Sequence, residues 1–158
     1  MFQLKAHPQG QELSDFIRNF GRSHRHLAAG KSKMAAWFVS NCNTPGGRER
    51  LVTKLKEQHF AVDIFGQCGD HECPRSNSSE CYRHVEADYK FYLSFENSVC
   101  EDYVTEKYYN VMRYNLIPVT YNGANMSAYG PPHSSINALD FSSTADLVEY
   151  LKEVGIPV

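Results

Sequence analysis

The stretch from Tyr89 to Asn110 constrains the fold of this 158-residue chain more than any other segment. Its first part, Phe91 to Phe95, alternates in polarity in the way that predicts a β-strand. Its last part carries Val104, Tyr108 and Val111 at helical spacing. The residues between them form a polar turn. Open α/β sheets build ligand sites where a strand runs through such a turn into a helix.

We expect the helix of this stretch to start near Asp102, a good N-cap residue, with Thr105, Glu106 and Lys107 in its first turn. Free backbone N–H groups and a lysine at a helix start suit a phosphate. A carboxylate at Glu106 can also accept hydrogen bonds from two sugar hydroxyls, so the turn favours a nucleotide sugar over a bare phosphate. The alternatives are a solvated Lys107 and a Glu106 that only complements the helix dipole.

Strand and helix patterns alternate along the rest of the chain. Helices are predicted at 48–60 and 144–154, and strands at 34–40, 61–65, 115–121 and 136–139. With the central stretch, this order predicts an open, mostly parallel Rossmann-like sheet with flanking helices. No G-x-G-x-x-G motif follows any predicted strand, which disfavours a dinucleotide-dependent dehydrogenase.

The length predicts one domain, which we assign to residues 34–158. Residues 1–33 form an irregular segment in this interpretation, with one short amphipathic helix at 12–20. Residues 66–88 are expected to be a long loop, and loops of this length inside a domain are usually functional or cross-linked.

Charge and hydropathy exclude two classes of function. The net charge is −2 and there is no basic stripe, so a nucleic-acid partner is not expected. No apolar run approaches the roughly 18 residues of a membrane-spanning helix. No secretory leader is recognisable at the start. Membrane attachment would therefore need an anchor that these residues do not contain.

Cysteine spacing favours disulfides over zinc. The five cysteines are Cys42, Cys68, Cys73, Cys81 and Cys100. The gaps within the middle cluster are four and seven residues, unlike the paired C-x₂-C spacing of zinc sites. Zinc bound with help from His71 and His84 is the weaker alternative. Disulfides imply a secretory-pathway lumen, which the glycosylation sequons at Asn77 and Asn125 also favour.

The central stretch also carries a family resemblance. Its segments FYLSFENS and DYVTEK resemble the signature of the α-1,3-fucosyltransferases, glycosyltransferase family 10. The resemblance extends from about residue 34 to 151, through AAWFVSN, VDIFG, IPVTYNG, a Pro-Pro pair and DFSSTADLVEYL. The spacing CG-x₃-CPR is similar to that of invertebrate members.

The resemblance implies inverting transfer of L-fucose from GDP-fucose to the 3-hydroxyl of N-acetylglucosamine in a glycoprotein glycan. It implies a GT-B fold, of which this chain corresponds to the C-terminal, donor-binding half. The catalytic base belongs to the family's N-terminal acceptor domain, so no catalytic residue is expected here. The chain alone is expected to bind GDP-fucose weakly and to turn over poorly or not at all.

Site roles also follow from the resemblance. It matches Arg48 and Lys107 to a phosphate-binding arginine and lysine, and Glu106 to a glutamate that holds the donor's ribose. It matches Tyr103 to a tyrosine of the pyrophosphate and ribose pocket, and Asn97 to an asparagine near the phosphates. From the residues alone, Arg48 is a helix-start residue, Tyr103 a hydrophobic staple and Asn97 a turn former.

Three further residues are reserve candidates for donor binding: Arg50, Lys90 and Glu96. No metal or tightly bound cofactor is required, since there is no D-x-D triplet and the two cations neutralise the leaving phosphates.

The resemblance implies the Golgi lumen or membrane, with an N-glycan or a Lewis-type glycan as acceptor. The alternative functions are a non-catalytic nucleotide-sugar-binding module and a disulfide-stabilised structural domain.

Overall fold

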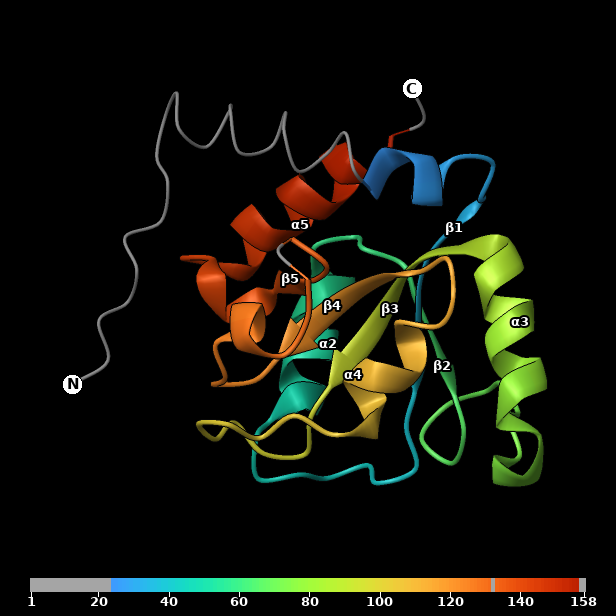
Figure 1. Cartoon of the computed structure of the whole chain (residues 1–158), viewed down its shortest axis with the longest axis horizontal. Helices are drawn as coiled ribbons and strands as arrows, with labels where there is room; N and C mark the ends of the chain where they lie inside the picture. Colours follow the sequence, from blue (N-terminus) through green and yellow to red (C-terminus); the bar gives the residue numbers. More distant parts are fainter. Residues whose placement is uncertain (1–23, 132, 157–158) are drawn as a thin grey trace.

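The core of the protein is a parallel β-sheet with β1 and β3 adjacent near its middle (Figure 1). The computed structural model describes residues 24–131 and 133–156. The strands in these residues are β1 (Lys33–Phe38), β2 (Val62–Phe65), β3 (Tyr89–Phe95), β4 (Ile117–Tyr121) and β5 (Ile136–Asn137). Their order is β2-β1-β3-β4-β5, and each adjacent pair is parallel. The predicted open, Rossmann-like sheet is confirmed.

Helices cover both faces of this sheet (Figure 1). The α-helices are α2 (Arg48–Glu57), α3 (Ser78–Asp88), α4 (Glu106–Val111) and α5 (Thr144–Val154). Short 3₁₀ turns are η1 (Arg75–Asn77), η2 (Met126–Ala128) and η3 (Ala138–Asp140). Helices α2 and α5 pack against one face, and α3 and α4 pack against the other. The bounds predicted for the last helix agree with α5.

Both faces of the central strand are buried. Phe91, Leu93 and Phe95 point towards α2 and α5, whereas Tyr92 packs against α3. All four side chains are at most 3% exposed. Burial of a large apolar side chain contributes about 1.5–3 kcal/mol, so this strand stabilises both helical layers.

The chain crosses over in opposite directions from the two adjacent strands. After β1 it continues through α2 to β2, on one side of β1. After β3 it continues through α4 to β4, on the other side. The position between β1 and β3, where the direction of the crossovers reverses, is called a topological switch point. A crevice opens there, outside the carboxyl ends of the strands, and ligands of α/β proteins bind in it.

The prediction of a long loop at 66–88 was wrong in its second half, where α3 occupies Ser78–Asp88. Only Tyr82 and Val85 of this helix are buried, so the apolar pattern is too sparse to predict a helix. Its Ser, Asn and Cys residues are typical of loops. Packing of Tyr82 against Tyr92 and Tyr114 is what holds this segment on the sheet.

The predicted start of α4 at Asp102 was also wrong. The N-cap is Thr105, whose hydroxyl accepts a hydrogen bond from the backbone N–H of Lys107. Asp102 instead has φ 56°, and its carboxylate accepts a hydrogen bond from the Tyr129 hydroxyl. The helix therefore begins at Glu106, one turn later than expected.

The two disulfides cross-link the loops at the carboxyl edge of the sheet. Cys42–Cys68 joins the loop after β1 to the loop after β2, and Cys73–Cys81 joins that second loop to α3. The disulfide prediction is confirmed, and Cys100 is the free, exposed cysteine. The sequon residues Asn77 and Asn125 are exposed, and their glycosylation stays a prediction.

The helix predicted at 12–20 and Pro132 of the Pro-Pro pair lie outside the described residues. Residues 24–28 are helical, and Ala28 is fully buried in the core on the α2 and α5 side. Packing therefore extends before residue 34, and the domain boundary at 33/34 stays a prediction.

We predict that the two disulfides stabilise the fold unequally. Their sequence separations are 26 and 8 residues. Because a longer closed loop loses more entropy from the unfolded chain, replacing Cys42 and Cys68 with serine should cost about 3–4 kcal/mol. The same change at Cys73 and Cys81 should cost about 2–3 kcal/mol. Urea unfolding of the two double variants measures both values. Equal stability of either variant and the wild type would contradict the prediction.

Candidate functional site

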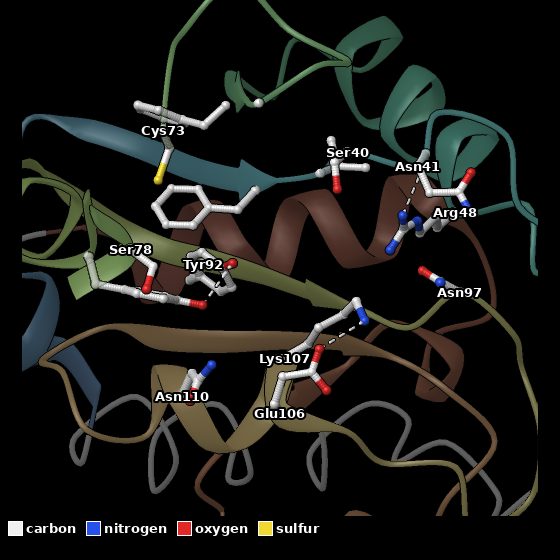
Figure 2. A pocket seen from close by; sticks show the side chains of 15 residues that line it. Ser40, Asn41, Arg48, Cys73, Ser78, Tyr92, Asn97, Glu106, Lys107 and Asn110 are labelled. Carbon is white, nitrogen blue, oxygen red and sulfur yellow. Dashed lines mark hydrogen bonds and ion pairs between the residues drawn. The ribbon is translucent and has the colours of Figure 1, made fainter. Parts of the chain in front are cut away.

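A cleft of about 460 Å³ opens at the carboxyl edge of the sheet, where β1 and β3 diverge (Figure 2). Its walls come from the loop after β1, the end of β2, β3 and the starts of α2, α3 and α4. Its volume lies within the range of small-molecule sites, about 300–1,000 Å³. Arg48, Asn97, Glu106 and Lys107 all line it, so four residues predicted for one site are brought together.

Arg48 connects the ends of the two central strands. Its Nη1 donates a 2.9 Å hydrogen bond to the carbonyl of Phe95, and its Nη2 donates one of 2.9 Å to the carbonyl of Asn41. Its Nε lies 3.4 Å from Glu49 Oε1, and the guanidinium lies 5.4 Å from the centre of the Trp37 ring. The side chain is only 2% exposed. Each terminal nitrogen keeps a second N–H, so the group can bind a ligand without leaving the carbonyls.

Glu96 fixes the start of α4 in the same region. Its side chain is fully buried and its carboxylate accepts hydrogen bonds from the backbone N–H of Thr105, at 2.9 Å, and from the Thr105 hydroxyl, at 2.8 Å. The same threonine hydroxyl caps the helix by accepting a hydrogen bond from the backbone N–H of Lys107. One buried carboxylate thereby positions the N-terminus of α4 at the end of β3.

Lys107 and Glu106 form the adjacent wall of the cleft. The Lys107 ammonium lies 3.6 Å from Glu106 Oε1 and 3.9 Å from Glu96 Oε2. The pKa of the Glu106 carboxyl is lowered, first by its own backbone N–H at the helix start and then by Lys107. Glu106 is therefore an ionised, 70% exposed hydrogen-bond acceptor at neutral pH.

Asn97 follows Glu96 and faces the cleft between Arg48 and Lys107 (Figure 2). Its backbone carbonyl accepts a hydrogen bond from the N–H of Gly46. Its Oδ1 atom is buried and has no hydrogen-bond partner in the described part of the chain. A buried acceptor without a partner costs about 1–3 kcal/mol, so this position favours a ligand that donates a hydrogen bond.

Besides Glu96, which lies behind the start of α4, three other predicted residues do not line the cleft. Tyr103 is 37% exposed on the turn before α4. Arg50 folds back over Gly47, whose added Cβ would lie 2.7 Å from the Arg50 guanidinium. Lys90 lies at the opposite end of β3, where its ammonium donates a hydrogen bond to the carbonyl of Gly155. The prediction that Lys90 reaches the site was wrong.

The sequence did not predict one end of the cleft. Ser78 and Tyr82 come from α3, and Asn110 comes from the far end of α4. Asn110 is four positions after Glu106, so the two share a helix face once the helix start is known. Nothing in the sequence indicated Ser78 or Tyr82, because α3 itself was not predicted.

Within residues 24–131 and 133–156, no group of three His, Cys, Asp or Glu side chains is arranged to hold a metal ion. The helices of the same residues include none with the length and apolar character to cross a bilayer.

Comparisons with known proteins agree with this arrangement. The family model described as "Glycosyltransferase family 10 (fucosyltransferase) C-term" matches residues 28–156. The chain is 47% identical over 128 residues to "Alpha-(1,3)-fucosyltransferase C" of Drosophila melanogaster, covering 81% of this chain and 30% of that protein. It is 43% identical over 127 residues to "Alpha-(1,3)-fucosyltransferase fut-1" of Caenorhabditis elegans, covering 80% and 29%.

A solved structure is also similar. The crystal structure of an α1,3-fucosyltransferase matches with a TM-score of 0.63 and 26% sequence identity. The match covers 86% of this chain and 40% of that one. The chain thus spans about 30% of the length of the Drosophila relative.

We predict that Glu96 is a structural residue of the site. Replacing it with alanine leaves the Thr105 N–H without its acceptor, which should lower the free energy of unfolding by about 1–3 kcal/mol. The exposed neighbour Glu106 is the control, and its alanine variant should change stability by less than about 0.5 kcal/mol. Chemical denaturation measures both. Equal stability of the Glu96→Ala protein and the wild type would disprove this role.

Proposed function

The chain belongs to glycosyltransferase family 10, the fucosyltransferases, and we propose that its cleft binds the nucleotide of GDP-fucose. In this proposal the chain supplies the donor-binding half of an inverting α-1,3-fucosyltransferase. The observation that carries it is the convergence of Arg48 and Lys107 on one cleft from two different loops. Two cationic side chains that line a crevice at the carboxyl ends of parallel strands can neutralise the charge of a diphosphate.

Arg48 and Lys107 are proposed to bind the two phosphates. The Arg48 guanidinium is held in place by the carbonyls of Asn41 and Phe95, so binding would cost little conformational entropy. The Lys107 side chain is 28% exposed, and its ammonium would exchange its contact with Glu106 for a phosphate oxygen. Cations placed in advance stabilise charge that develops on a leaving group.

Glu106 is proposed to accept hydrogen bonds from the hydroxyls of the donor's ribose. Its ionised carboxylate is exposed beside Lys107, which supports this role because a carboxylate can accept from two neighbouring hydroxyls. Asn97 is proposed to lie next to the phosphates, where its amide N–H₂ can donate to a phosphate oxygen and its buried Oδ1 can accept only from a hydroxyl of the sugar. Tyr103 stays a proposal as a residue of the pyrophosphate and ribose pocket.

The reaction proposed for the whole enzyme is a single displacement. The acceptor's 3-hydroxyl oxygen attacks C1 of fucose, its proton passes to a general base, and the bond from C1 to the β-phosphate oxygen breaks. GDP leaves with the electron pair, and its charge is neutralised by Arg48 and Lys107. We propose that the general base belongs to another part of a longer enzyme, because the chain spans about 30% of the Drosophila relative.

We propose the Golgi lumen as the compartment, with a glycoprotein glycan as the acceptor. The two disulfides support an oxidising lumen.

A purely structural domain is the alternative function. The observation that favours it is that Arg48 already donates hydrogen bonds to two carbonyls and is nearly buried. It predicts no binding of nucleotides, whereas the proposed function predicts binding that depends on Lys107.

We predict that Lys107→Ala weakens GDP binding at least about tenfold, because a charge-assisted hydrogen bond contributes about 1.5–3 kcal/mol. Lys56→Ala is the matched control, since Lys56 is an exposed lysine of α2 that does not line the cleft. Isothermal titration with GDP measures the affinities, and thermal melting checks that the variants fold. Wild-type protein that is folded and releases no heat with millimolar GDP would overturn the proposed function.

A further inference from the structure

A second cavity lies at the carboxyl ends of β4 and β5 and shares no lining residue with the donor cleft. We call it the polar cavity; its lining includes Ser127, Ser134, Ser135 and Asn137. Its volume is about 290 Å³, at the lower limit of small-molecule sites, which is about 300–1,000 Å³. No lysine or arginine is among the described residues that line it, so a neutral ligand as small as one sugar ring suits it best.

Asn125 lies at the rim of the polar cavity and begins the sequon Asn125-Met126-Ser127. Its Oδ1 accepts a 3.3 Å hydrogen bond from the backbone N–H of Ser127 and thereby caps η2. Because the oxygen and nitrogen of an amide lie on opposite sides of its axis, this bond holds the oxygen against the turn and leaves the nitrogen on the other side. Both Asn125 and Ser127 are exposed, so the folded chain has room for a modified amide.

We propose that Asn125 carries an N-linked glycan whose first N-acetylglucosamine lies in the polar cavity, a proposal that rests on the proposed lumenal compartment. The amide nitrogen of Asn125 forms a bond to C1 of the sugar and loses one proton. The bond from C1 to the diphosphate of a lipid-linked oligosaccharide breaks, and the diphosphate leaves with the electron pair. The host cell supplies this co-reactant and the enzyme that transfers the glycan.

The walls of the polar cavity match the two kinds of surface on a pyranose ring. Met126 and Pro131 supply carbon atoms on which the apolar face of the ring can pack. The hydroxyls of Ser134 and Ser135 and the amide of Asn137 can form hydrogen bonds with the sugar hydroxyls and the acetamido group. A sugar held by these contacts would stabilise the loop between β4 and β5.

The polar wall has a fixed position before any sugar is attached. The Asn137 Nδ2 donates a 3.3 Å hydrogen bond to the carbonyl of Asn122, and its Oδ1 accepts one of 3.2 Å from the N–H of Leu139. The Ser134 hydroxyl lies 2.9 Å from the hydroxyl of Tyr108, a residue of α4 that is 1% exposed. A wall that is already ordered reduces the entropy lost when a sugar packs against it.

The other sequon, which begins at Asn77, serves as an internal control. Asn77 directly precedes α3, and its amide nitrogen donates a hydrogen bond to the carboxylate of Glu80. It does not line the polar cavity, so a sugar attached there would gain none of the contacts described above.

The test uses the full chain, secreted from mammalian cells that are grown with a mannosidase inhibitor. Asn77→Gln leaves Asn125 in the remaining sequon, and mass spectrometry should find Asn125 glycosylated. Endoglycosidase H then trims the glycan to its first N-acetylglucosamine, and the melting temperature should not change. Asn125→Asp in the same background carries no sugar and should melt about 2–4 °C lower, the shift expected for the loss of a few contacts in a chain of this size.

Two further variants separate packing in the polar cavity from a general effect of glycosylation. Met126→Ala keeps the sequon and should stay glycosylated, but it should narrow the difference in melting temperature between trimmed and sugar-free protein. In a chain glycosylated only at Asn77, trimmed and sugar-free protein should melt at the same temperature.

An unmodified Asn125 in secreted, folded protein would overturn the proposal. So would equal melting temperatures of the trimmed protein and the Asn125→Asp protein. GDP affinity should be the same with and without the sugar, because the polar cavity is separate from the donor cleft. Failure of this proposal therefore leaves GDP binding intact, whereas folded protein that binds no GDP in any form overturns the proposed function.

Discussion

The interaction on which the site depends is the buried guanidinium of Arg48. It holds the carbonyl of Phe95, at the end of β3, and that of Asn41, after the end of β1. These strands diverge at the switch point, so their ends would otherwise expose unpaired carbonyls to the crevice. Burying a charge is costly unless it is well paired. Here two carbonyls, Glu49 and the Trp37 ring offset that cost.

A second buried charged side chain fixes the link between the end of β3 and the start of α4. There the buried charge is the Glu96 carboxylate, which orients Thr105 and thereby the first turn of α4. Arg48 and Glu96 thus fix the two loops whose side chains converge on the cleft. The groups at the cleft surface, Glu106 and Lys107, are attached to a helix start that already has a fixed position. A site built in this way needs little rearrangement when a ligand binds.

Sequence reasoning predicted the sheet because its strands carry strong patterns. Phe91 to Phe95 alternates clearly, and the core residues Trp37 and Val39 belong to an apolar run of strand length. It failed where tertiary contacts decide the local structure. Helix α3 is held on the sheet by Tyr82, and Thr105 becomes the N-cap of α4 because Glu96 binds it. Neither contact can be derived from local propensity. The candidate site shows the same division, since the motif predicted Glu106 and Lys107 but gave no information on Ser78 or Tyr82.

The cleft contains a buried hydrogen-bond acceptor without a donor, as is expected of a binding surface. The Oδ1 atom of Asn97 is buried without a partner among the described residues, although the backbone carbonyl of the same residue accepts a hydrogen bond from the N–H of Gly46. A residue chosen only for stability would not leave an acceptor in this state, because the unpaired group costs about 1–3 kcal/mol. Proteins accept such local costs mainly at functional sites. The unpaired amide oxygen of Asn97 therefore favours a ligand-binding role for this crevice over a purely structural one.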